Sequence, residues 1–321
     1  VYVLISLIIR FRGTGIILRL LPPIVTGPVI VVIGLVLAPV AVNMALGKNS
    51  DGSAVLFPEQ TALIVSMVSL AATVLASLLG RGLLRLVPIL CGITVGYVCS
   101  ILLGIHDFGK MAAAPWFSVP NFVFPEFRLE AILYIIPITL APLIEHFGDV
   151  IAISSVTGKD FLKDPGIKNT MLGDGLATMF ASLVGGPPNT TYSEVTGAVA
   201  LTRAFNPAIM TWAALCAILL ACVNKLGAFL SSIPTPVMGG IMILLFGAIM
   251  VVGLNTLVRA GHDLMEPRNL AVVALIIIFG VGGMTFNIGS FRLGGIGLAA
   301  VTGVLLNLVL PRARAEKRAA A

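Results

Sequence analysis

Long apolar runs divide this chain, and its charged residues fall mainly between them. Eight runs are almost free of charge: 24–46, 61–80, 87–105, 131–144, 207–223, 237–258, 269–284 and 293–310. A helix that crosses ~30 Å of hydrocarbon needs ~20 such residues at a rise of ~1.5 Å each. The period-two alternation of a transmembrane barrel is absent. The pattern therefore predicts an all-α polytopic membrane protein.

The composition excludes a soluble domain of this size. Of the 321 residues, 58% are hydrophobic and 11% are charged, against about 25% charged residues in an ordinary soluble domain. Too few polar residues remain to coat a soluble core. The four cysteines lie inside apolar runs without the pairing of a metal site, so neither a bound metal nor a cofactor is expected.

The start of the chain falls inside an apolar run. Only nine residues precede Arg10, which is about half of a span. No basic stretch precedes this run and no small-residue cleavage site follows it, so it is not a signal peptide. We expect that the true N-terminus lies before Val1.

The basic residues predict an orientation in the membrane. If the loop at Arg10 and Arg12 is cytoplasmic and the spans alternate, 15 of the 20 basic residues lie inside and five lie outside. The five outside residues are Lys48, Lys110, Arg128, Lys225 and Arg292. The positive-inside rule supports this threading. It predicts a protein of the inner (cytoplasmic) membrane with residues 311–321 as a cytoplasmic tail, and it explains the basic tail without nucleic acid.

Three carboxylates are expected at membrane depth: Glu145, Asp149 and Glu194, with Asp174 a borderline fourth. A buried carboxylate costs several kcal/mol unless it is paired or faces water, so it marks a site by default. The helix that carries Glu145 is expected to run from about 130 to 157, which puts Glu145 ~22 Å from one end and ~18 Å from the other. Glu145 is therefore a candidate binding residue.

Asp149 lies one helical turn after Glu145 and shares its face. Two carboxylates on one buried face repel, so one of them should hold a proton near neutral pH. Glu145 and Asp149 are thus candidates for proton coupling, although Asp149 could instead face a solvated vestibule. His146 lies about 100° around the helix from Glu145. It either satisfies a hydrogen bond in the core or supports the site.

A second candidate site begins at Gly185-Gly186-Pro187-Pro188 and ends at Glu194. Two glycines and two prolines cannot continue a helix. The apolar runs on either side, 169–184 and 195–202, are each too short to span a membrane. This is typical of a discontinuous helix pair, whose open backbone lines a cavity. The other interpretation is a surface loop.

The second site offers groups that suit a small planar polar ligand. Backbone N–H groups and the helix N-terminus near Tyr192, Ser193 and Glu194 would contact the ligand, with Asn189 in support. A nucleobase presents N–H donors and carbonyl acceptors on one ring, which match carboxylates and backbone amides respectively.

These motifs resemble those of the uracil permease branch of the nucleobase–ascorbate transporter family. The resemblance extends from Val1 to about Leu310. It is carried by Glu145-His146-Phe147-Gly148, by Gly185-Gly186-Pro187-Pro188-Asn189-Thr190-Thr191-Tyr192-Ser193-Glu194, by Lys159-Asp160-Phe161-Leu162-Lys163-Asp164-Pro165-Gly166, by Leu201-Thr202-Arg203 and by Pro236-Val237-Met238-Gly239-Gly240.

The resemblance implies fourteen spans in two inverted repeats of seven, of which this chain lacks about the first three. Core-type, substrate-binding spans would occupy residues 1–19 and 129–234, and gate-type spans residues 20–128 and 235–310. It further implies that Glu145 and Glu194 bind the ring, with help from the backbone at Ser193. Asp149 stands where the uracil branch often has the histidine tied to proton coupling. Val195 stands where the family signature has asparagine, and Ser193 where glycine is common.

The leading hypothesis is proton-coupled symport of a nucleobase, with uracil preferred. The alternatives are a permease of the same class for xanthine, urate or another small planar anion, and a fragment without function by itself. An intramembrane enzyme using Glu145 and Asp149 lacks any catalytic motif, so no catalytic residue is expected. The expected partners are the lipid bilayer and the substrate, with the proton as coupling ion; a homodimer is left open.

Overall fold

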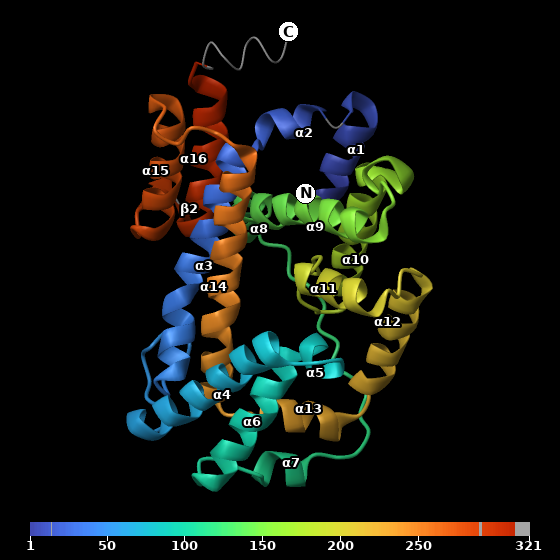
Figure 1. Ribbon diagram of the computed structural model, residues 1–321, viewed down its shortest axis with the longest axis vertical. Coiled ribbons are helices and arrows are strands. Elements are labelled where there is room, and N and C mark those ends of the chain that lie inside the picture. Colours follow the sequence, from blue (N-terminus) through green and yellow to red (C-terminus); the bar gives the residue numbers. More distant parts are fainter. Residues whose placement is uncertain (14, 289–290, 312–321) are drawn as a thin grey trace. The chain divides into compact units, whose positions relative to one another are not determined.

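A computed structural model of the chain describes residues 1–13, 15–288 and 291–311. The side chains of a few residues inside helices and strands, Ser193 and Glu194 among them, lie outside this description. The described part is predominantly helical (Figure 1). It divides into two compact units. Unit 1 comprises residues 1–36, 123–196 and 248–321, and unit 2 comprises residues 37–122 and 197–247.

The helices and strands follow the apolar runs in order. They are α1 (Tyr2–Arg12), α2 (Gly15–Leu20), α3 (Pro23–Ala45), α4 (Glu59–Leu79), α5 (Leu83–Leu86), α6 (Pro88–Leu102), α7 (Gly109–Ala113), α8 (Leu129–Ile138), α9 (Leu140–Thr157), a π-helical turn (Leu162–Gly166), α10 (Ile167–Leu183), α11 (Ser193–Thr202), α12 (Ala208–Ala221), α13 (Asn224–Ser231), α14 (Thr235–Ala260), α15 (Pro267–Val281), β1 (Thr285–Ile288), β2 (Phe291–Gly294) and α16 (Gly295–Val309).

Among the described residues, three helices are long and apolar enough to cross a membrane: α3, α4 and α14. A fourth candidate is the pair α12 and α13, which is bent by 87°. The helices α6, α15 and α16 have 15 residues each, or about 22 Å of length. The structure thus confirms the coarse prediction of a membrane protein with several apolar helices. The inverted repeats and the division into core-type and gate-type spans stay predictions.

Unit 1 holds two apolar cores. Residues of α3, α14, α15 and α16 build the first, around Val29, Val272 and Ala299. Residues of α1, α3, α9 and α10 build the second, around Leu143 and Met171. The second core holds α9 in place beside α1 and α10, and α9 carries most of the candidate site.

Small residues bring the helices of unit 2 together. A side chain on Gly240 of α14 would clash with the carbonyl of Ser66 on α4. The hydroxyl of Ser69, also on α4, lies 3.0 Å from the Gly92 carbonyl of α6 and 3.1 Å from the Val237 carbonyl of α14. Close approach at glycine together with a serine hydrogen bond is the usual means of helix association in a membrane.

Two sequence expectations were wrong in detail. The helix expected from about 130 to 157 is interrupted at Thr139, between α8 and α9, which lie end to end (Figure 1). Pro142 explains the interruption, because it has no N–H to donate to the carbonyl of Ile138. The chain is also not wholly helical, since β1 and β2 form an antiparallel hairpin. Gly283, with a φ of 74°, separates this hairpin from α15.

Candidate functional site

The two carboxylates of α9 lie one turn apart, as the sequence predicts. Glu145 is half-buried, and Asp149 is 6% exposed. Gly148 lies between them, and a side chain added there would meet no atom within 4 Å. Space therefore remains along α9 next to both carboxylates.

Asp149 connects α9 to the segment that precedes α11. The hydroxyl of Thr191 donates a short hydrogen bond to Oδ2 of Asp149. A buried carboxylate needs such a donor, because its desolvation is costly otherwise. The bond therefore holds the segment before Ser193 against the helix that carries Glu145.

That segment is non-helical, which confirms the predicted break between two helices. α10 ends at Leu183, residues 186–192 have no regular secondary structure, and α11 begins at Ser193 (Figure 1). Gly185 has a φ of 83°, a conformation that glycine adopts without strain. Thr178 of α10 holds this segment at Asn189. Its Oγ1 accepts from the Asn189 N–H at 3.2 Å and donates to the Asn189 carbonyl at 3.1 Å.

The predicted binding residues of this segment lie at the start of α11. Tyr192 is the last residue before α11 and is 65% exposed. Glu194 is in the first turn, where a helix presents unpaired backbone N–H groups. The predictions for the side chains of Ser193 and Glu194 fall outside the described part of the chain. Asn189 contributes its backbone, to Thr178.

His146 points to α10, where it makes two hydrogen bonds. Its Nδ1 lies 3.1 Å from Oδ2 of Asp174, and its Nε2 lies 3.0 Å from Oγ1 of Thr170. His146 is 2% exposed and the Asp174 side chain 11% exposed. The ring edge of Tyr2, from α1, packs against the imidazole with centroids 5.9 Å apart. His146 is therefore a buried connection between α9 and α10.

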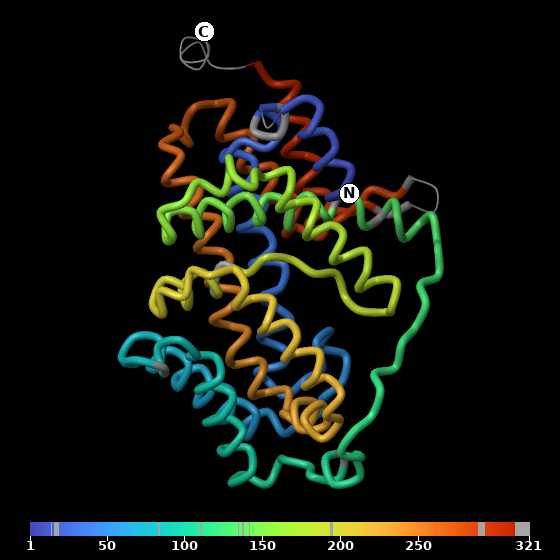
Figure 2. Tube along the Cα trace, turned by 90° about the vertical axis from the view of Figure 1, so that its right-hand side faces the viewer, coloured from blue at the N-terminus to red at the C-terminus, as the bar shows by residue number. Residues whose placement is uncertain are grey.

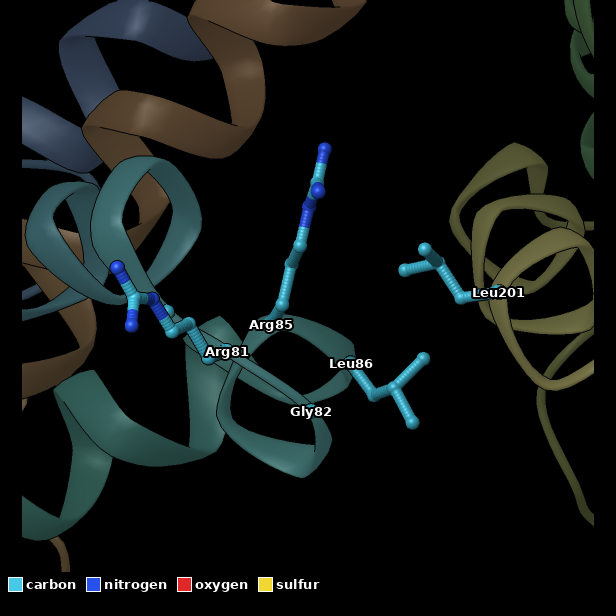
Figure 3. A pocket seen from close by; sticks show the side chains of 6 residues that line it. Arg81, Gly82, Arg85, Leu86 and Leu201 are labelled. Carbon is cyan, nitrogen blue, oxygen red and sulfur yellow. The ribbon is translucent and has the colours of Figure 1, made fainter.

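A cavity of about 470 Å³ lies in unit 2, away from these residues in sequence. Figure 3 shows its lining: Arg81, Gly82, Arg85 and Leu86 around α5, and Leu201 on α11. Neither guanidinium has an ion-pair partner among the described residues. None of the predicted site residues lines this cavity, so it adds nothing to the interpretation of Glu145 and Asp149.

Sequence reasoning missed three contributors to the site: Thr191, Thr170 and Tyr2. Thr191 lies inside the predicted segment, but a hydroxyl next to a buried acid has no sequence signature. Asp174 could be found, because a charge inside the apolar run 169–184 already marks a site. The sequence could not show that its partner is His146, 28 residues earlier.

Comparison with known proteins decides the family. A profile described as “Permease family” matches residues 1–289. The chain belongs to the nucleobase–ascorbate transporter family. One relative in this family is the probable uracil permease of Haemophilus influenzae, 54% identical over 98% of this chain and 75% of its own length. Others are the uracil permeases of Bacillus caldolyticus, 44% identical over 97% and 72%, and of Escherichia coli K12, 40% identical over 96% and 71%.

Proposed function

We propose that this chain is a nucleobase permease of the inner membrane that takes up uracil together with a proton. Uracil is proposed as the substrate because relatives named as uracil permeases match nearly the whole chain. Their names say nothing of the coupling ion. The proton is proposed as the coupling ion because α9 carries two acids one turn apart, of which Asp149 is buried.

The geometry of the site supports a small planar ligand with both donors and acceptors. The Thr191–Asp149 bond holds the segment before α11 against α9. Glu145 and the start of α11 therefore lie near each other within unit 1. A carboxylate at Glu145 can accept from a ring N–H, and the backbone N–H groups at Ser193 and Glu194 can donate to a ring carbonyl. In this proposal both glutamates contact the ring and Tyr192 lies beside it.

Asp149 is proposed to exchange the proton and not to contact the ring. It is the more deeply buried of the two α9 acids, and its Oδ2 is already occupied by Thr191. A carboxylate can exchange a proton. The bond to Thr191 connects this one to the segment that is proposed to contact the substrate.

The remaining parts of the proposal concern architecture. The chain is proposed to contribute core-type spans from 1–19 and 129–234 and gate-type spans from 20–128 and 235–310 of a seven-plus-seven inverted repeat. Its C-terminus is proposed to be cytoplasmic, which the distribution of basic residues supports. No catalytic residue, metal or organic cofactor enters the proposal.

Uptake of labelled uracil tests the proposed function. The complete gene would be expressed in a strain without its own uracil permease. We expect uptake that a protonophore abolishes and that excess unlabelled uracil suppresses far more than xanthine or urate does. Equal suppression by xanthine would support the alternative substrates instead. Uptake that persists with a protonophore and follows a sodium gradient would contradict proton coupling.

A further inference from the structure

Two prolines leave a backbone carbonyl of α2 without a partner in its own helix. The helix ends at Leu20, and Pro22 and Pro23 follow it closely. A longer helix would pair the Arg19 carbonyl with the N–H of residue 23, which proline lacks. The carbonyl therefore needs a donor from another element or from water.

Asn307, in the last turn of α16, supplies this donor. Its Nδ2 donates to the Arg19 carbonyl at 2.9 Å and lies 3.4 Å from the Leu20 carbonyl. Arg268 of α15 donates from Nη2 to Oδ1 of the same amide at 2.8 Å. Arg268 and Asn307 thus form a clasp that fixes the end of α2 to α15 and α16. Figure 2 shows the N-terminal part of the chain (blue) beside the C-terminal part (red).

The preceding helix, α1, is fixed to α10 instead. The Ser6 hydroxyl is buried and donates to the Lys168 carbonyl at 2.6 Å. A side chain on Gly175 would put its Cβ 2.9 Å from the Tyr2 Cβ, so the bare glycine lets α1 approach α10 closely. The Tyr2 ring then packs edge-on against His146. The helices that carry the candidate site therefore hold α1.

Gly13 lies between these two attachments. It follows the last residue of α1 with a φ of 79° and a ψ of 170°, a conformation that is open essentially to glycine alone. A Cβ added there would meet no atom within 4 Å, so nothing packs against this side of the residue. Hinges are a few such positions at the ends of helices, where large changes in φ and ψ can be absorbed.

We propose that α1 turns about Gly13 during transport, while the clasp of Arg268 and Asn307 keeps α2 fixed to α15 and α16. This inference rests on the proposed function. Alternating access requires the elements that carry the substrate to move against the others. α1 then moves with α9 and α10, and α2 stays with the gate-type helices. The border between core-type and gate-type parts accordingly lies at Gly13 and not after residue 19.

Asn307→Asp tests the clasp through a single hydrogen-bond donor. The carboxylate keeps an acceptor for Arg268 but cannot donate to the Arg19 carbonyl. The matched control is Asn169→Asp on α10, whose amide donates to the Pro165 carbonyl at 2.7 Å. Protein from the complete gene would be reconstituted in vesicles, and both uracil affinity and uracil exchange at equilibrium would be measured.

We expect Asn307→Asp to slow exchange at least ten-fold with less than a two-fold change in uracil affinity, because the site is intact and only its movement lacks support. The control should stay within two-fold of the parent in both measurements. Parent-like exchange by Asn307→Asp would show that the clasp does not support transport. An equal loss of affinity and exchange would also overturn the proposal, since the clasp would then shape the binding site itself.

Gly13→Ala tests the hinge, with Gly15→Ala as its control. Neither added methyl meets an atom within 4 Å, but alanine is strained at the φ of Gly13 and suits the first residue of α2. We expect Gly13→Ala to slow exchange at least ten-fold at nearly unchanged uracil affinity, and Gly15→Ala to behave like the parent. The same exchange rate in both variants would place the movement elsewhere in the chain.

Thermal unfolding separates failure of this inference from failure of the proposed function. Loss of the bond to Arg19 should lower the unfolding midpoint of Asn307→Asp below that of Asn169→Asp, whatever the transported substrate is. A parent protein that neither binds nor exchanges uracil would contradict the proposed function even if this midpoint falls. A parent that exchanges uracil, together with a Gly13→Ala variant that does so equally fast, would overturn the hinge alone.

Discussion

The Thr191 hydroxyl donates to Oδ2 of Asp149, and this one bond joins the break before α11 to the acid-bearing face of α9. A change at Thr191 therefore alters the environment of Asp149. In an alternating-access cycle such a link would let substrate at one element affect protonation at the other.

Thr191→Val should weaken the coupling while Thr191→Ser preserves it. Valine keeps the shape of threonine but cannot donate to Asp149, whereas serine keeps the hydroxyl. We expect Thr191→Val to shift the pH dependence of uracil accumulation and Thr191→Ser to leave it close to that of the parent. The comparison is a series of uptake measurements across pH in vesicles. The same profile for both variants would show that the bond plays no part in coupling.

Glu194→Gln should abolish or alter substrate binding. The amide replaces one acceptor oxygen by a donor, so a ring N–H loses its partner. Because a site built around a polar pair rejects a mismatched partner strongly, we expect a loss of uracil affinity of at least ~100-fold. Glu126→Gln is the control, since Glu126 is exposed and forms an ion pair with Arg128. Unchanged uracil affinity in Glu194→Gln would exclude Glu194 as a ligand.

Gly175→Ala should destabilise unit 1, whereas Gly173→Ala on the same helix should not. The added methyl at Gly175 crowds Tyr2 and the backbone of Val3, and overpacking of this kind costs about 1–3 kcal/mol. At Gly173 a methyl meets nothing within 4 Å, and alanine is the better helix former by up to ~1 kcal/mol. Thermal unfolding in detergent compares the two. A Gly175→Ala protein as stable as the parent would mean that α1 does not pack here.

Two glycines on α14, within unit 2, allow a similar comparison between a crowded and an open position. A methyl at Gly240 runs into the Ser66 carbonyl, while one at Gly247 meets no atom within 4 Å. Because a backbone carbonyl cannot move aside as a side chain can, we expect Gly240→Ala to lower the unfolding midpoint clearly. Gly247→Ala should leave the midpoint unchanged. Equal midpoints would argue against the close approach of α4 and α14.

Much of this organisation could be predicted from the sequence, because apolar length and the position of prolines act locally. The break at 185–192 follows from Pro187 and Pro188, and the start of α11 at Ser193 was expected within one residue. The depth of Glu145 rested on an unbroken helix, and Thr139 interrupts it. The pairing of His146 with Asp174 depends on how α9 packs on α10, which no local pattern encodes. The hairpin after α15 was missed for the same reason.

The most direct test of proton coupling through Asp149 is the variant Asp149→Asn. Asparagine keeps the size of the side chain but cannot bind the proton. Glu145 and Glu194 remain, so substrate should still bind and exchange across the membrane. Accumulation against a gradient should fail, because no proton moves with the substrate. Exchange and proton-driven uptake of uracil would be measured side by side in the same vesicles. We predict near-normal exchange without accumulation; normal proton-driven accumulation by Asp149→Asn would contradict the assignment.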